Sequence, residues 1–223
     1  MAAQAPVITV DGPSGVGKGT IGHLLTRRLQ WHFLDSGALY RVTGLAARRH
    51  GVDFTDVPAL EALARSLDVE FDFEGSIFLE KQDVTGDVRT EQAGNDASKV
   101  AAILEVRAAL LQRQRDFREF PGLVADGRDM GTTVFPEAPV KIFLTASPEI
   151  RAERRYKQLK EKGLDVNLSN LLSEIAERDE RDRNRSASPL KPASDAVVVD
   201  TSELGIDDVF QQIMAIVEER LEV

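Results

Sequence analysis

The sequence predicts an α/β fold in which a five-stranded parallel sheet carries helices on both faces. Three observations lead to this prediction: short apolar runs with the composition of buried strands, helix-like segments between most of them, and a glycine-rich loop directly after the first run. The five predicted strands are Val7–Val10, Trp31–Leu34, Leu123–Ala125, Val140–Leu144 and Ala196–Val199.

Composition limits the class of protein. With 223 residues, of which 42% are hydrophobic and 29% charged, the chain can bury one sizeable core, so we expect a single domain over residues 1–223. Because there is no cysteine, disulfides and thiolate metal sites are excluded, and a cytoplasmic location is expected. The net charge of −9 argues against bulk nucleic-acid binding. No apolar run reaches the ~20 residues of a membrane helix, and the start lacks an export signal.

The loop after the first strand fits the phosphate-binding template G-x-x-x-x-G-K. Glycines let successive backbone N–H groups curl around a phosphate, and the lysine brings a mobile ammonium to the outer phosphates. The alternative is a glycine-rich surface turn, but strand, loop, lysine and helix follow in the required order. Gly19 departs from the template, which has Ser or Thr there. We expect nucleotide to contact Gly12, Pro13, Ser14, Gly15, Val16, Gly17, Lys18, Gly19 and Thr20.

Acidic residues follow four of the predicted strands, namely Asp11, Asp35, Asp126 and Asp200. Ligands of open α/β sheets bind at this carboxyl edge, although an aspartate there can also simply cap the next helix. The capping explanation is favoured for Asp35 and Asp200. Asp126 differs because Gly127-Arg128-Asp129 follows at once. Together with Thr20, Asp126 is the candidate for placing Mg²⁺, and contact through water is expected at the acidic residue.

A long excursion separates the second and third strands, and residues 53–92 form a predicted insertion. Apolar spacing predicts a helix over Asp56–Leu67. Alternation and turn residues then predict an antiparallel meander with strands at Asp68–Phe73, Ser76–Glu80 and Val84–Thr90. We expect this insertion to form a wall or lid beside the active edge.

The next segment, Asn95–Phe117, is predicted to be one helical run with an apolar stripe. Arg107 falls on that stripe, and the pattern leaves open whether it serves a site or snorkels from the edge of the stripe to solvent. No Pro or Gly lies between residues 98 and 107 to interrupt the helix.

The highly charged segment Ala152–Glu180 is interrupted by Gly163-Leu164-Asp165. This pattern predicts two helices flanking a mobile, solvated hairpin, so that residues 152–178 form a lid. An ordinary amphipathic helix over Ile206–Leu221 is expected to close the chain.

An arginine-rich run covers Glu177–Arg185, and on a helix its Arg178, Asp182 and Arg185 share one face. The simpler explanation is a solvated helix carrying ion pairs. However, the run abuts Ser188-Pro189-Leu190, where the helix should end before the last strand. It is therefore placed to project towards the carboxyl edge of the sheet.

Two further arginines, Arg41 and Arg128, follow the second and third strands at that same edge. Arginine presents a planar fork that binds phosphate oxygens in pairs and keeps its charge. Several arginines beside a phosphate loop imply two bound phosphates, which separates a kinase from a simple nucleotide hydrolase.

These residues resemble a known family. The loop ending Gly-Lys-Gly-Thr is similar to that of the nucleoside monophosphate kinases. Three segments, Asp35–Arg41, Ala125–Thr132 and Arg178–Arg185, closely resemble the bacterial cytidylate (CMP) kinases. The meander insertion and the short charged lid are also that family's pattern. The resemblance runs across almost the whole chain, and Asp-Gly-Arg-Asp-Met-Gly is its most specific part.

The resemblance implies the P-loop nucleoside monophosphate kinase fold and a monomeric cytoplasmic enzyme that transfers the γ-phosphate of ATP to CMP or dCMP with Mg²⁺. It implies catalytic roles for Lys18, Arg128 and Arg185. Cytosine would be surrounded by Ser98, Arg107 and Asp129. The acceptor phosphate would be held by Arg41, Arg128 and Arg185 with Ser36 and Tyr40 nearby, and the sugar by Arg178 and Asp182. On the ATP side it leaves Arg151, Arg154 and Arg155 of the lid as equal candidates.

Chemistry supports the base assignment, because a carboxylate such as Asp129 accepts from the cytosine amine while Arg107 donates to ring acceptors. Uracil would leave buried polar groups unpaired. One difficulty is that Ser98 and Arg107 are nine residues apart, so one straight helix would point them in opposite directions. If both contact the base, the helix must break between them.

Other functions stay open at this level. A P-loop kinase could use UMP, dTMP or a non-nucleotide alcohol as its acceptor. A GTP-dependent switch or a motor-type ATPase is a different class, but the Asn-Lys-x-Asp guanine motif is absent from the sequence. A binding module that lost its chemistry is disfavoured by Lys18 and the arginines. The sequence does not distinguish CMP from dCMP, or direct from water-mediated contact between Mg²⁺ and Thr20.

Overall fold

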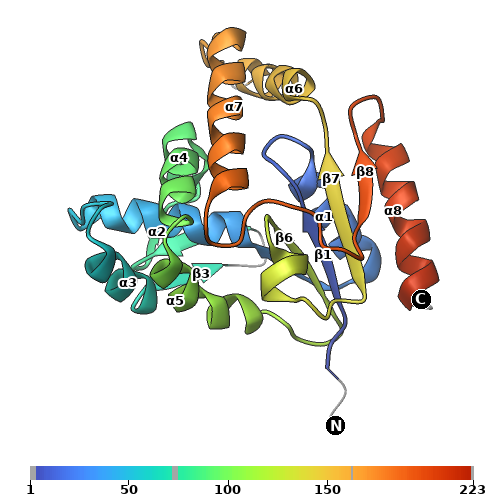
Figure 1. Cartoon of the computed structure of the whole chain (residues 1–223), viewed down its shortest axis with the longest axis horizontal. Helices are drawn as coiled ribbons and strands as arrows, with labels where there is room; N and C mark the ends of the chain where they lie inside the picture. Colours follow the sequence, from blue (N-terminus) through green and yellow to red (C-terminus); the bar gives the residue numbers. More distant parts are fainter. Residues whose placement is uncertain (1–3, 72–74, 162, 222–223) are drawn as a thin grey trace. The chain divides into compact units, whose positions relative to one another are not determined.

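The computed structural model of the chain describes residues 4–71, 75–161 and 163–221 (Figure 1). These residues form two compact units. The first unit combines Met1–Asp35 with Arg115–Val223, and the second unit is Ser36–Gln114. In the described part of the chain, no helix combines the length and apolarity that crossing a membrane requires.

The first unit is built on a five-stranded parallel sheet in the order β2-β6-β1-β7-β8, which confirms the predicted fold class. Every predicted strand is present, and each extends into the polar residue or residues that follow its apolar run. The carboxyl ends are in register: Asp35 lies opposite Asp126, and Asp11 lies opposite Gly127. The strands are β1 Val7–Asp11, β2 His32–Asp35, β6 Leu123–Gly127, β7 Val140–Thr145 and β8 Val197–Asp200.

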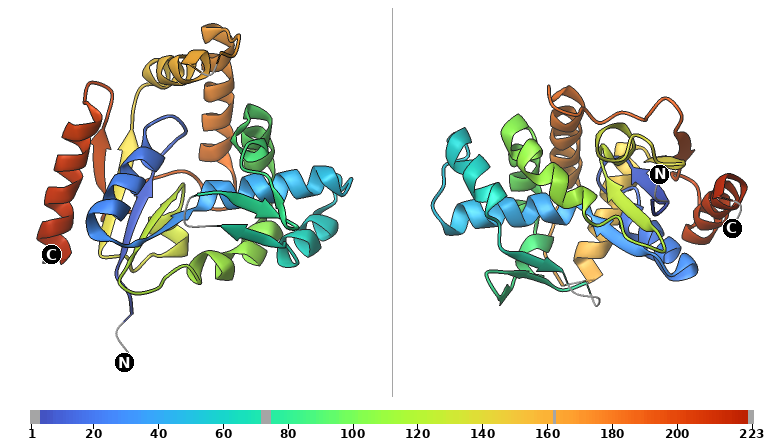
Figure 2. Two further views of the ribbon diagram at one scale, coloured as in Figure 1. Left: turned by 180° about the vertical axis from the view of Figure 1, so that it is seen from behind. Right: turned by 90° about the horizontal axis from the view of Figure 1, so that it is seen from below.

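Helices cover both faces of this sheet. α1 (Lys18–Leu29) and α8 (Ile206–Leu221) contact each other and share one apolar core with the sheet, to which Ile8 and Val10 contribute (Figure 2). Thr9 points to the opposite face, where it meets the short π-helix η2 (Met130–Val134). This alternation along β1 is the two-residue period of a strand.

The charged segment folds as predicted into two helices, α6 (Pro148–Glu161) and α7 (Leu168–Asn184), which pack against each other. The turn between them includes Gly163, whose backbone has φ +74°. The side chain of Asn167 caps α7 by accepting from the N–H groups of Ser169 and Asn170.

The second unit has its own apolar core, formed mainly by helices and a small antiparallel sheet in the order β3-β4-β5. Its predicted first helix is confirmed, with Asp56 as the N-terminal cap. Its elements are α2 Ser36–Arg49, α3 Val57–Arg65, β3 Val69–Phe71, β4 Ile77–Leu79, β5 Gln82–Asp83, the 3₁₀-helix η1 Asp87–Arg89, α4 Glu91–Val100 and α5 Leu104–Arg115, whose last residue belongs to the first unit.

The meander differs from its prediction in one strand. The third strand is Gln82–Asp83 rather than Val84–Thr90. The reason is a two-residue turn at Glu80 and Lys81, both with positive φ (51° and 66°), which brings the chain back sooner than expected. The predicted first strand, Asp68–Phe73, is observed over Val69–Phe71, and residues 72–74 lie outside the described part.

The prediction of one helix over Asn95–Phe117 is wrong, because α4 ends at Val100 and α5 begins at Leu104. Between them, Ala102 and Ile103 donate to carbonyls three residues back (3.2 and 3.1 Å), the tighter pattern that often ends a helix. The Arg107 guanidinium donates to the Ala101 carbonyl at 3.2 Å. The helix therefore breaks without Pro or Gly, with a side chain satisfying a carbonyl at its end.

Candidate active site

The phosphate loop runs from the end of β1 to the start of α1, and its glycines are required by geometry. Gly12, Gly15 and Gly17 have φ of +149°, +80° and +95°. A Cβ on Gly12 would lie 2.3 Å from the Leu144 carbonyl oxygen of β7. No side chain caps the N-terminus of α1, whose first turn follows Gly17. The arrangement is that of an anion-binding helix N-terminus.

Lys18 is the buried cation of this loop. Its Nζ donates to the Pro13 carbonyl at 3.0 Å and lies 3.8 Å from Asp126 Oδ1. Burial, and then the positive charges of Arg128 and Arg178, lower the pKa of Lys18 from 10.5 to about 8, although Asp126 opposes the shift. Positive charge is therefore concentrated where the template places phosphates.

Asp35 ends β2 and lies opposite Asp126, the residue before the last in the neighbouring strand β6. Burial raises the pKa of Asp126 from 3.8 to about 6, with Lys18 opposing the shift and the charge of Asp35 adding to it. Gly19 brings the loop close to this carboxylate: a Cβ on Gly19 would lie 3.7 Å from Asp126 Oδ2. Thr20, the other predicted magnesium residue, is exposed in the first turn of α1.

The arginine face of α7 forms around Asp182, as the spacing predicted. Arg128 Nε donates to Asp182 Oδ2 at 3.1 Å. Burial works against ionisation of Asp182, but Arg128, Arg178 and Arg185 together hold its pKa below 3.8. Arg185 Nε donates to the Ser188 carbonyl at 2.6 Å, which fixes it where the helix ends. In the first unit, the structure thus brings Lys18, Arg128, Arg178, Asp182 and Arg185 into one electrostatic cluster.

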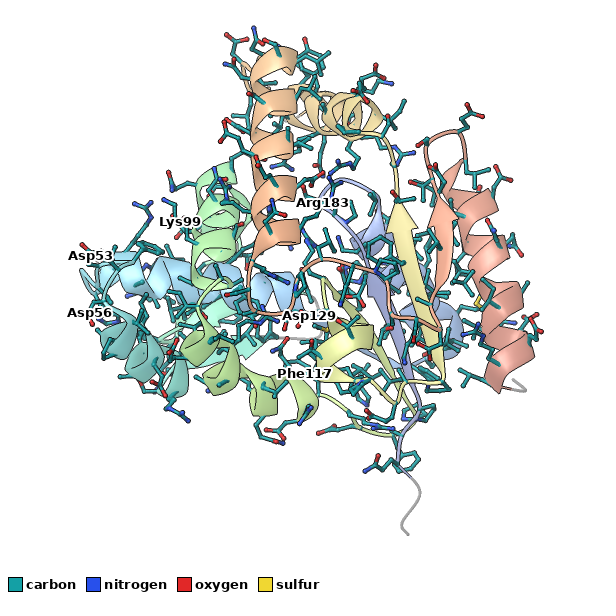
Figure 3. The ribbon with its side chains drawn as sticks, in the orientation of Figure 1. Asp53, Asp56, Lys99, Phe117, Asp129 and Arg183 are labelled. Carbon is teal, nitrogen blue, oxygen red and sulfur yellow. The ribbon has the colours of Figure 1, made fainter. Side chains whose placement is uncertain are left out.

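Asp129 lies at the turn between β6 and η2, where Figure 3 labels it, and only 2% of its surface is exposed. The two residues after it, Met130 and Gly131, donate their N–H groups to the carboxylate of Asp11, both at 2.8 Å. The sequence identifies Asp11 only as an acidic strand end and does not reveal that it holds this turn. Burial raises the pKa of Asp11 to about 7 despite these two hydrogen bonds.

The second unit contains the other predicted acceptor residues. Arg41 Nη1 donates to the carbonyls of Val88 and Thr90 (2.8 and 3.1 Å). The Arg107 guanidinium lies 5.4 Å from the centre of the Tyr40 ring, and with 8% exposure it does not snorkel. Ser98 is buried in α4.

Ser36 donates to Oε1 of Gln114 at 2.8 Å, and both side chains are buried. Gln114 is a second residue missed from the sequence. Its position seven residues after Arg107, on the same helix face, was the signal that could have found it.

The three lid arginines have different surroundings. Arg151 is 1% exposed and makes a two-pronged ion pair with Asp179. Arg154 donates to the hydroxyl of Thr201 at 2.9 Å and to its carbonyl. Arg155 donates to Gln158 within its own helix. Arg151 is thus a buried residue whose guanidinium binds a carboxylate of the protein, whereas Arg154 and Arg155 are only partly buried.

Comparisons with known proteins agree with this site. Residues 8–219 match the family model described as cytidylate kinase. Proteins named cytidylate kinase from Stutzerimonas stutzeri and Photobacterium profundum are 60% and 59% identical, covering 99% and 100% of this chain and 98% and 99% of their own lengths. One from Aeromonas hydrophila is 58% identical over 99% of this chain and 97% of its own length. The chain belongs to the cytidylate kinase family.

Proposed function

We propose that the protein transfers the γ-phosphate of ATP to CMP or dCMP, giving ADP and CDP or dCDP. The observation that carries the proposal is the cation cluster of the first unit, in which Arg128 and Arg178 lie near enough to Lys18 to lower its pKa. Phosphoryl transfer needs alignment and neutralisation of spread negative charge more than covalent help. Fixed cations beside a phosphate loop supply both.

On the donor side, the N–H groups of the loop would bind the ATP phosphates, and Lys18 would exchange the Pro13 carbonyl for a phosphate oxygen. We assign catalytic roles to Lys18, Arg128 and Arg185, which neutralise the phosphoryl group as it moves. Asp182 and the Ser188 carbonyl support two of these roles, because they hold Arg128 and Arg185 in fixed orientations.

On the acceptor side, Arg41, Arg128 and Arg185 would hold the CMP phosphate, with Ser36 and Tyr40 beside it. Two backbone carbonyls orient the Arg41 guanidinium, and Gln114 orients the Ser36 hydroxyl. Arg178 and Asp182 would meet the sugar. These assignments rest on family membership together with the local order of each side chain.

For the base, we propose that Asp129 accepts from the amine of cytosine while Arg107 and Ser98 contact its ring acceptors. The break between α4 and α5 supports this set, because it removes the continuous helix that would point Ser98 and Arg107 in opposite directions. Burial of Asp129 makes a mismatched base costly, since uracil would turn a carbonyl oxygen towards the buried carboxylate.

The donor set near the loop fits Mg²⁺. Asp126 and Asp35 supply carboxylate oxygens in neighbouring strands, and Thr20 adds a hydroxyl in the first turn of α1. Magnesium takes oxygen ligands and keeps several waters. We propose that Thr20 and Asp126 hold it together with the ATP phosphates, Asp126 through water. When bound, the ion would add positive charge at the phosphates. The alignment of the two nucleotides would come from the loop and the arginines described above.

A panel of acceptors tests the proposal. CMP, dCMP, UMP and dTMP are each offered with ATP and Mg²⁺, and ADP formation is followed by a coupled assay. We expect fast turnover with CMP or dCMP and little ADP without an acceptor, because closure of such enzymes normally waits for both substrates. Equal turnover of UMP and CMP would contradict the assignment of the base site, and acceptor-independent hydrolysis would indicate an ATPase.

Asp129→Asn sharpens the test of base selection. An amide can both donate and accept, so we expect the ratio of kcat/KM for CMP to that for UMP to fall by about tenfold to a hundredfold. Glu137→Gln, an exposed carboxylate paired with Arg118, is the matched control and should leave the ratio unchanged. An unchanged ratio in Asp129→Asn would remove Asp129 from the base site.

We extend the proposal to a monomeric, cytoplasmic enzyme whose partners are its small-molecule substrates rather than nucleic acid or membrane. The proposed reaction supports this location, since ATP and nucleoside monophosphates are intracellular metabolites. Light scattering at assay concentrations should give the mass of one chain with and without nucleotides, and a stable dimer would correct the proposal.

A further inference from the structure

Arg151 and Asp179 form a buried junction beneath the phosphate loop. Arg151 lies in the first turn of α6, and its Nη1 donates to Asp179 Oδ1 at 3.0 Å while Nη2 pairs with Oδ2. The same guanidinium donates to the carbonyls of Ser14 (3.1 Å) and Ala146 (3.2 Å). One side chain therefore joins both lid helices to the loop and to the segment after β7.

The loop rests directly on this junction. A Cβ on Gly15 would lie 3.1 Å from the Cβ of Arg151 and 3.5 Å from its carbonyl oxygen. Gly15 thus allows the loop backbone to approach α6, and the bond to the Ser14 carbonyl fixes the residue before it. The planar fork of arginine is suited to this task, because it serves a carboxylate and carbonyls in different directions at once.

The other side of the junction sets the position of α7. Asp179 directly follows Arg178 and precedes Asp182 by three residues, so both carboxylates lie on neighbouring positions of one helix face. Arg151 holds the first carboxylate and Arg128 the second. These two anchors fix where Arg178 lies relative to Lys18, whose pKa it lowers.

We propose that the Arg151–Asp179 pair is a positioning device that keeps the arginines of α7 in register with the phosphate loop, and that Arg151 does not contact ATP itself. It acts through the Ser14 carbonyl and through Asp179. This inference rests on the proposed kinase function, because its effect is read in turnover.

The test replaces the pair by apolar residues. Arg151→Met and Asp179→Leu are made singly and together, since a buried pair replaced as a whole often keeps its stability while a single replacement leaves a buried charge. We expect each single variant to melt lower and the double variant to melt close to the wild type. In the double variant, kcat should still be at least about tenfold lower, and KM for CMP should rise more than KM for ATP, because the arginines of α7 are assigned to CMP and to the transferring phosphoryl group.

Arg183→Met is the matched control. Arg183, labelled in Figure 3, lies in α7. Its guanidinium is 3.7 Å from the same Asp179 carboxylate, but its side chain is 61% exposed. Its loss should change kcat by less than about twofold, since exposed ion pairs contribute little. Arg151→Lys covers the case in which the single variants do not fold: it keeps the charge and loses the fork, and it should fold with reduced kcat.

Three results overturn the inference. A double variant with wild-type kcat makes the pair purely structural. Arg151→Met that raises KM for ATP far more than Asp179→Leu does makes Arg151 a direct ATP contact. Wild-type kcat in Arg151→Lys shows that the fork is not needed. All three results are read in kinase turnover, and failure of the proposed function is recognised separately, because the wild-type protein would then not phosphorylate CMP or dCMP.

Discussion

In the phosphate loop a buried cation donates to a carbonyl a few residues back in the chain, and the same is true at the junction of α4 and α5. Lys18 reaches Pro13 and Arg107 reaches Ala101, at 3.0 and 3.2 Å. The loop takes its shape from left-handed glycines, whereas Ala101 at the junction has ordinary helical angles (φ −69°, ψ −13°). The shape of the loop is thus encoded locally, and we infer that the shape of the junction depends on its arginine.

The largest expected effect comes from Lys18→Met, which separates function from shape in the loop. We expect kcat to fall by about a thousandfold, because the cation at the transferring phosphate is lost. The melting temperature should stay the same or rise at pH 7, since burial makes the charged form of Lys18 unfavourable in the fold. Coupled assays and thermal melts measure both. A wild-type rate would remove Lys18 from the catalytic residues.

Gly12→Ala tests whether the shape of the phosphate loop depends on its own glycines. The new Cβ would meet the Leu144 carbonyl at 2.3 Å, a contact with backbone that only movement of β1 or β7 relieves. We expect a loss of unfolding free energy of about 3 kcal/mol, measured by urea denaturation. Gly86→Ala is the control, because nothing lies within 4 Å of its Cβ position and its φ is −68°. Equal stability of the two variants would show that the loop tolerates a different path.

Arg107→Met tests whether the junction needs its arginine. The Ala101 carbonyl would lose its guanidinium donor and the Tyr40 ring its cation, so we expect destabilisation by about 1–3 kcal/mol and a higher KM for CMP. Lys99→Met is the control, since Lys99 lies in the last turn of α4, on the other side of the break from Arg107, and is exposed. If both variants unfold alike in urea, the break between α4 and α5 does not depend on Arg107.

The smallest effect is a pH dependence that belongs to the loop alone. Phosphate binding favours charged Lys18, so ATP should raise a pKa that burial and neighbouring arginines have lowered to about 8. Below pH 8 Lys18 is already charged before ATP binds. Above pH 8, ATP binding takes up a proton, and the affinity for ATP should therefore weaken by up to about tenfold per pH unit. Calorimetry in buffers of different ionisation enthalpy measures the uptake. Lys18→Met should abolish it.

The difference between the phosphate loop and the junction of α4 and α5 also explains which elements the sequence could predict. The loop, the strands and the two lid helices follow from nearby residues: glycines, apolar runs and the interruption at Gly163. The helix break at residues 101–103 follows from hydrogen bonds and burial around Arg107, which spacing alone does not reveal. The early turn at Glu80 and Lys81 was missed because neither residue is the glycine or asparagine that usually marks positive φ.

The site shows the same limit. The residue types around Lys18 and on the face of α7 were predictable, since charge and spacing identify them. The supporting residues Asp11, Gln114 and Asp179 act on backbone groups or on other side chains, and only the folded chain brings these partners together. Arg151 was therefore grouped with Arg154 and Arg155, although its surroundings are quite different.

One consequence follows from the hydrogen bonds between Asp11 and the N–H groups of Met130 and Gly131. Asp11 is the last residue of the central strand and directly precedes Gly12, so the end of β1 both anchors the turn that carries Asp129 and begins the phosphate loop. These two regions should therefore exchange their amide hydrogens as one cooperative unit, with Met130 and Gly131 protected as strongly as the centre of β1. A change that destabilises the carboxyl end of β1 should therefore disturb both the phosphate loop and the turn that carries Asp129.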